Sequence, residues 1–148
     1  MLPRLLLAVC LLGVSALFSQ GCSKPQTPEE EIRAVIAAGE LAAESRDLSG
    51  VMALVSDRYQ GEQGQAREEL RNQLRGYFVL YPSVHLWTRI ESVEFPYTDM
   101  ARVRLAVAAV GRELPQAGEL ELAADVHEVE LRFEHEAGRW LVTRADWR

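Results

Sequence analysis

The chain has 148 residues, a formal net charge of −6 and only two cysteines. This length suits one domain with a hydrophobic core. An acidic chain without a basic stripe argues against nucleic acid as a partner, and acidic lipid headgroups would repel it.

The N-terminal segment carries the strongest signal. Arg4 precedes an apolar run over residues 5–18, and Gly21 stands just before Cys22. A positive start, a short apolar centre and a small residue before a cleavage site are typical of a secretory signal peptide. The run is shorter than the roughly 20 apolar residues that a membrane-spanning helix needs. We therefore expect residues 1–21 to be a signal peptide that is removed on export.

This leader resembles those of bacterial lipoprotein precursors, in which the cysteine after the cleavage site carries the lipid. The resemblance implies acylation of Cys22, as with palmitate, and a polar tether over residues 22–27. The acyl anchor would hold the chain to the outer or inner membrane on the periplasmic side. Because Cys10 lies in the leader, the acylated domain would have no free thiol. Alternatively, Ser19 and Gly21 suit ordinary signal peptidase, which would release a soluble periplasmic protein.

The first half of the remaining chain predicts three helices. Thr27 can cap a helix whose first turn contains a proline, and Glu30 is placed for a capping box. Apolar residues at helical spacing then predict a first helix over 28–45, a short second helix capped by Ser49, and a third helix over 65–81.

From residue 84 onward the apolar residues recur with a period of two, which predicts antiparallel strands. The strands are expected over residues 84–95, 101–109, 120–133 and 139–148. In the first and third strands the alternation changes parity, before Val93 and before Val129 respectively. A β-bulge produces such a change, and bulges curve a sheet.

Helices followed by long, bulged strands predict an α+β fold, with N-terminal helices packed on one strongly curved antiparallel sheet. Two segments, "SRDLSGVMALVSDRYQG" at 45–61 and "GRWLVTRADW" at 138–147, resemble the nuclear transport factor two-like superfamily in their order and pattern. That superfamily has a cone-shaped, cystatin-like fold and includes polyketide-cyclase-like enzymes. The resemblance covers residues 28–148 as one domain and rests on no catalytic motif.

The resemblance implies a pocket between the curved sheet and the helices. The candidate residues for this pocket are Asp57, Tyr59, Phe78, Tyr81, His85, Trp87 and His127. Enzymes of this fold use a carboxylate or histidine as base, beside a donor for the developing oxyanion. Structural roles explain the first two residues at least as well, since Asp57 can accept backbone hydrogen bonds and Tyr59 can fill the core.

Asp125 and His127 stand two apart on one predicted strand and could form a carboxylate–histidine pair, although a solvated strand face explains them more simply. The histidines lie on separate segments without ligand spacing, so no metal site is expected. No motif indicates a cofactor. Cross-strand ion pairs are expected to join Arg102 and Arg104 to glutamates 91 and 94.

Three tryptophans lie in the predicted strands: Trp87, Trp140 and Trp147. Packing in the core or on a sheet face is their expected role, but one exposed at the mouth of a pocket would instead contact a ligand. An exposed apolar sheet face would predict a homodimer through that face.

Two functions fit these observations. We favour a lipid-anchored, non-catalytic periplasmic domain that binds a small apolar ligand or a partner protein, because no catalytic pair can be named. The alternative is a small cofactor-free lyase or isomerase of the polyketide-cyclase-like type, with Asp57, Tyr59 or His127 as acid–base groups. A deep pocket with two converging ionisable groups would favour the enzyme, and a filled cone would favour binding.

Overall fold

The computed structural model describes residues 26–112 and 125–147. Its elements in these ranges are α1 (Pro28–Glu44), α2 (Leu48–Ala53), the 3₁₀-helix η1 (Glu62–Gly64), α3 (Arg67–Leu80), β1 (Ser83–Tyr97), β2 (Met100–Arg112), β3 (Asp125–Glu136) and β4 (Arg139–Trp147). The strands form one antiparallel sheet in the order β1-β2-β3-β4. The predicted α+β class is therefore confirmed.

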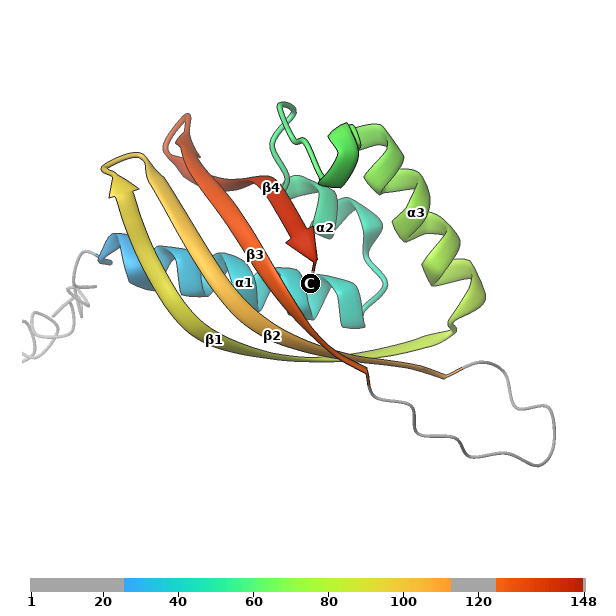
Figure 1. Ribbon diagram of the computed structural model, residues 1–148. Helices are drawn as coiled ribbons and strands as arrows, with labels where there is room; N and C mark the ends of the chain where they lie inside the picture. Colours follow the sequence, from blue (N-terminus) through green and yellow to red (C-terminus); the bar gives the residue numbers. More distant parts are fainter. Residues whose placement is uncertain (1–25, 113–124, 148) are drawn as a thin grey trace, which may run out of the picture.

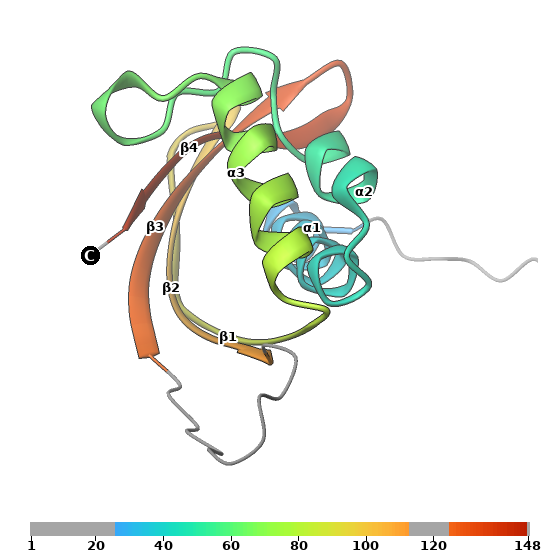
Figure 2. The same cartoon turned by 90° about the vertical axis from the view of Figure 1, so that its right-hand side faces the viewer.

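The sheet is strongly curved, and the helices lie on its concave side (Figures 1 and 2). We call this concave side the inner face and the opposite side the outer face. Helix α1 runs along the inner face and contacts β1 and β4, whereas α3 stands beside α2.

The start of α1 is as the sequence predicts. Thr27 accepts a hydrogen bond from the Glu30 backbone N–H at 3.2 Å, and the Glu30 carboxylate accepts one from the Thr27 N–H at 2.8 Å. This reciprocal pair satisfies two N–H groups that a helix start otherwise leaves without partners.

The second helix begins earlier than predicted. Asp47, and not Ser49, is its N-cap, and the Asp47 carboxylate accepts a hydrogen bond from the Gly50 N–H at 2.9 Å. Both residue types cap helices well, so sequence alone does not choose between them. Helix α3 ends at Leu80 because the backbone of Tyr81, which precedes a proline, is extended.

The bulge predicted in β1 is confirmed by a register shift between Ile90 and Ser92. The bulge predicted in β3 is wrong within the described residues, because β3 pairs with β2 from Asp125 to Glu134 without a shift. The sequence suggested that bulge because Val126 and Val129 have opposite parity. In the structure Val126 simply points to the outer face and is 67% exposed.

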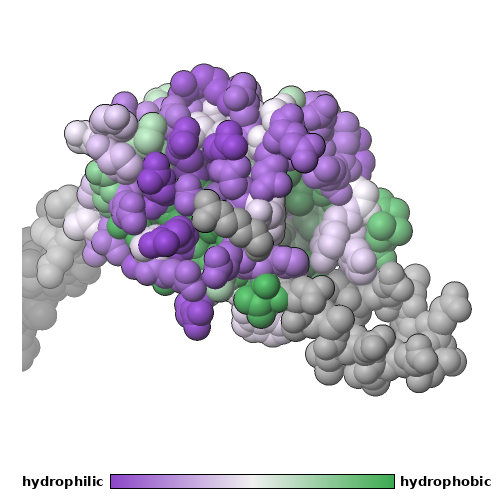
Figure 3. Space-filling model, in the orientation of Figure 1, coloured by the Kyte–Doolittle hydropathy of each residue, from purple (hydrophilic) through white to green (hydrophobic). Residues whose placement is uncertain are grey.

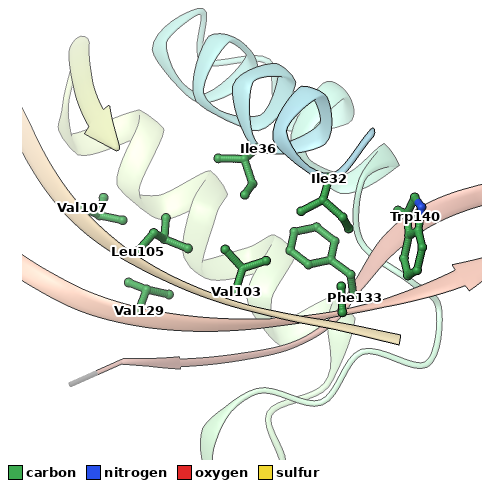
Figure 4. Close-up of a cluster of buried hydrophobic side chains, with 9 residues drawn as sticks. Ile32, Ile36, Val103, Leu105, Val107, Val129, Phe133 and Trp140 are labelled. Atoms are coloured by element: carbon green, nitrogen blue, oxygen red, sulfur yellow. The ribbon is translucent and has the colours of Figure 1, made fainter. Parts of the chain in front are cut away.

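The main core lies between α1 and the inner face (Figure 4). Ile32 and Ile36 of α1 pack against an apolar patch of the sheet, in which Val103 and Phe133 are fully buried. Trp140 is also buried here, as predicted, and its indole N–H donates to the Glu31 carboxylate at 2.9 Å.

A second core joins α2, α3 and the end of β4. Its buried members are Met52, Val55, Tyr59 and Ala145, and partly buried leucines from α2 and α3 pack against them. Segment 54–60 also pairs with the free edge of β4, where the Ser56 N–H donates to the Val142 carbonyl at 2.9 Å. This pairing protects an edge that would otherwise be open to other strands.

Candidate functional site

The two predicted pocket residues from the loop after α2 lie in different surroundings. The Asp57 side chain is 97% exposed and lies 3.5 Å from the guanidinium of Arg67. Tyr59 is 4% exposed and belongs to the second core. Burial raises the pKa of Tyr59, and the carboxylate of Asp146 raises it further. Tyr59 therefore fills the core, which is the structural role that its sequence position also allowed.

Phe78 and Tyr81 stabilise the C-terminal end of α3. Phe78 is buried, and its carbonyl accepts a hydrogen bond from the guanidinium of Arg46. Tyr81 is half-buried and packs on Tyr77, with 4.5 Å between the ring centroids. Both rings contact that of Tyr77.

His85 and Trp87 lie on the outer face, which corrects their expected position in the pocket. Their neighbours Leu86 and Ile90 pack on the main core, so the residues of opposite parity in this part of β1 point away from it. Trp87 is 59% exposed, and its ring stacks on that of His85 at 6.3 Å. Sequence alternation showed that these two residues share a face but not which face.

His127 is the predicted polar residue that does lie on the inner face. It has the same parity as Val129, which is buried in the main core, and its own side chain is exposed. Across the β3–β4 pair, Trp147 stands opposite Val129 and therefore also faces inward. The Trp147 ring meets the His127 ring edge-on at 6.4 Å. We call His127 and Trp147 the aromatic mouth.

Trp147 was not among the predicted pocket residues. Its side chain is 55% exposed, and its backbone N–H donates to the Glu62 carboxylate at 2.8 Å. Its face depends on a bulge in β4, where Arg132 stands opposite Arg144 while Phe133 stands opposite Val142. The apolar residues of β4 do change parity, from Trp140 and Val142 to Ala145 and Trp147, and this signal could have assigned Trp147 to the inner face.

The inner face between α1 and the sheet is filled by side chains, not hollow (Figure 4). Hollows among the described residues lie elsewhere. An open one of about 670 Å³ follows the β1–β2 turn at residues 95–99. A polar one of about 140 Å³ is lined by Arg58, Gln60, Arg132, Glu134, Thr143 and Arg144. Neither brings two predicted acid–base residues together.

No family model and no curated protein matches this sequence significantly. Solved structures do match it in shape. A Nostoc punctiforme domain of unknown function with a cystatin-like fold is 17% identical, with a TM-score of 0.64 over 82% of this chain and 78% of that one. A protein of unknown function from Shewanella oneidensis, described as NTF-2 like, is 17% identical, with a TM-score of 0.61 over 82% and 98% of the two chains. The chain has the cystatin-like fold of these proteins.

Proteins with this cystatin-like fold include enzymes. The hexachlorocyclohexane dehydrochlorinase LinA-type3 from Novosphingobium barchaimii is 11% identical to this chain, with a TM-score of 0.63 over 81% of it and 84% of the enzyme. Such low identity establishes the shared fold alone, because one fold carries many activities.

The polar hollow of this cystatin-like domain is built by a charged network. The Ser56 hydroxyl donates to the Glu136 carboxylate at 2.8 Å, and the Arg58 guanidinium donates to Glu134 and Glu136, each at 2.8 Å. The hydrogen bond from Ser56, and the hydrogen bond and positive charge of Arg58, lower the pKa of Glu136. Arg58 thus pairs with both glutamates of β3, and the network attaches segment 54–60 to that strand.

The outer face is largely hydrophilic (Figure 3). Arg104 lies 4.0 Å from Glu94, as predicted, whereas Arg102 pairs with Glu130 at 3.5 Å instead of with Glu91. The third strand supplies this closer partner. These ion pairs lie on the face through which a homodimer was predicted, and that dimer stays a prediction.

Within residues 26–112 and 125–147, no group of three His, Cys, Asp or Glu side chains could hold a metal ion. In the same two segments, no helix is long and apolar enough to span a membrane. Cys22, the predicted lipidation site, and the side chain of Asp125 lie outside what the structure describes.

Proposed function

We propose that this chain is a lipid-anchored periplasmic binding domain that takes a small apolar ligand at the aromatic mouth and performs no chemistry on it. The exposure of Trp147 on the inner face carries this proposal. A half-exposed indole leaves apolar area in contact with water, and covering it with a ligand is favourable.

The core of the domain is complete without Trp147. The main core and the second core bury other residues, and Trp147 belongs to neither. The imidazole of His127 adds a polar edge beside the indole. A flat apolar surface with one polar group beside it is a typical lining for a small-ligand site.

The arrangement supports binding better than catalysis. Acid–base chemistry needs two ionisable groups within reach of one substrate. His127 is the candidate base on the inner face, but Tyr59 is enclosed in the second core and Asp57 points into solvent beside Arg67. The alternative, a cofactor-free lyase or isomerase that uses His127 as base, therefore lacks its second group among the described residues.

The anchor is proposed from the leader and from charge. The signal-like segment ends just before Cys22, and polar residues separate that cysteine from α1 in the sequence. With a net charge of −6, the chain would gain little from electrostatic attraction to acidic lipids, so an acyl chain is the better means of attachment.

Two exposed tryptophans provide a matched test of the binding site. Trp147 is 55% exposed on the inner face, and Trp87 is 59% exposed on the outer face. We expect the wild type and Trp87→Ser to bind the apolar dye anilinonaphthalene sulfonate with equal affinity, measured by fluorescence titration. Trp147→Ser should bind it at least about tenfold more weakly, because the indole supplies most of the apolar contact.

Equal binding by the two serine variants would contradict the proposed site. Circular dichroism of both variants controls for misfolding. The enzyme alternative predicts instead that His127→Ala abolishes turnover of an apolar substrate while leaving dye binding unchanged.

A further inference from the structure

The β1–β2 turn presents aromatic side chains at one end of the molecule. Tyr97 is 66% exposed and Phe95 is 39% exposed, with the exposed Pro96 between them. The turn closes where Tyr97 pairs with Met100. These residues border the open hollow at this end, so their apolar surface is accessible from outside.

This turn is firmly held. The carbonyl of Asp99 accepts a hydrogen bond from the His135 N–H at 2.8 Å, which joins the turn to β3. The Phe95 ring lies 6.0 Å from the Trp140 ring, and the Trp140 indole donates to Glu31 in the first turn of α1. The aromatic turn is therefore braced, through one indole ring, against the start of α1.

The start of α1 is also where the proposed anchor joins the domain. Cys22 precedes Thr27 by five residues, and a fully extended chain of that length reaches at most about 18 Å. Figure 1 shows the β1–β2 turn and the start of α1 at the same end of the domain. An acyl chain on Cys22 would thus hold this end close to the membrane surface.

The side chains at this end suit a neutral lipid surface. Tyr and Phe favour the headgroup region, where an apolar ring can be buried while a phenol O–H stays in contact with water. Three consecutive glutamates, residues 29–31, and Asp99 add negative charge nearby, which disfavours anionic headgroups.

We propose that residues 95–97 rest in the headgroup region of the membrane to which Cys22 is anchored. This inference depends on the acyl anchor of the proposed function. This contact also sets the orientation of the domain on the membrane. His127 pairs with Val107, which lies seven residues along β2 from Met100, or about 23 Å from the turn. The aromatic mouth then lies about that far from the membrane surface, toward the other end of the strands.

Spin labels on the processed, lipidated protein in phosphatidylcholine vesicles test this contact. The lipidated chain has no free thiol, so Thr98→Cys and Glu128→Cys each give one labelling site, the first in the turn and the second near the far end of β3. We expect the label at position 98 to show an oxygen-to-nickel-complex accessibility ratio several times that at position 128. Adding Tyr97→Ser should lower the ratio at position 98, and Trp147→Ser should not.

Equal ratios at the two positions would overturn the membrane contact while leaving the anchor intact. A label at position 98 that is shielded from both reagents would also overturn it, because that result indicates a protein partner. A parent chain whose Cys22 thiol reacts with the label has no anchor, and that outcome overturns both the anchor and the contact.

Discussion

Ile32 connects the amphipathic pattern of α1 to the stability of the whole domain. Its side chain is fully buried between the helix and the sheet, in contact with the main core. We expect Ile32→Ala to lower the free energy of unfolding by about 2–5 kcal/mol, through lost burial and the cavity left behind. Urea denaturation measures this change.

Arg33 supplies the matched control on the exposed side of the same helix. It is half-exposed and forms an i,i+4 ion pair with Glu29. Arg33→Ala should cost no more than about 0.5 kcal/mol. If the two alanine variants unfold at the same urea concentration, α1 does not pack on the sheet as described.

Glu136 makes stability depend on acidic pH. Its hydrogen bonds from Ser56 and Arg58 hold its pKa below the ordinary value of 4.5, so the folded state favours the ionised carboxylate. That stabilisation is complete above about pH 4.5 and is lost as the pH falls through the lowered pKa. Glu136→Gln should therefore be less stable than the wild type at neutral pH, and the two should converge in acid.

Thermal unfolding of both proteins across this pH range measures the difference in stability. The control is Glu128→Gln, because Glu128 is an exposed carboxylate on the outer face. A constant gap between Glu136→Gln and the wild type from neutral to strongly acidic pH would refute the linkage.

Single residues differed in how well the sequence predicted them. Thr27 and Glu30 were assigned correctly because a capping box is a local pattern that needs no tertiary contact. His85 and Trp87 were misplaced because alternation gives two equivalent faces, and only the packing of α1 decides which one is inner.

At the scale of elements, one arginine links the two halves of the helical layer. Arg46, in the turn between α1 and α2, donates to the carbonyls of Phe78 and Pro82 at the end of α3. Removing it would leave a helix-end carbonyl without its partner, so Arg46→Ala should cost about 1–3 kcal/mol. Arg75→Ala, on the exposed surface of α3, should have little effect.

Hydrogen exchange localises this effect. The Tyr81 N–H, which donates to the Tyr77 carbonyl at 2.9 Å, should lose protection in Arg46→Ala and keep it in Arg75→Ala. If protection of Tyr81 is unchanged in both variants, Arg46 does not hold the end of α3.

The elements themselves were largely predictable, and the bulges were only partly so. The parity change in β1 marked a real register shift, since residues on both sides of it must reach the core. In β4 the bulge falls at Thr143, and the apolar residues change parity across it, from Val142 to Ala145. This parity change was not used to predict a bulge, although the bulge decides the face of Trp147, the residue on which the proposed site depends.

For the whole molecule, the order of elements was enough to predict the cystatin-like fold, but not whether side chains fill its inner face. The fold leaves room for a pocket in some proteins, whereas here α1 fills the inner face with Ile32 and Ile36. The proposed binding therefore depends on the two residues of the aromatic mouth and not on the fold itself.

The anchor predicts where the protein is found in the cell. Cys22→Ala should leave the chain either unprocessed or in the soluble fraction, because the acyl chain has no other attachment site. Immunoblotting of soluble and membrane fractions measures this, with Ser23→Ala as the control. A Cys22→Ala chain that is processed and still sediments with membranes would show that another feature binds them.

The central claim is that an acyl chain on Cys22 holds this binding domain at the envelope. Mass spectrometry of the N-terminal peptide from the membrane fraction tests it most directly. We predict a peptide that begins at Cys22 and carries the added mass of fatty acyl groups. A peptide that begins at Cys22 or Ser23 without any lipid, or one that retains the leader, would contradict the claim.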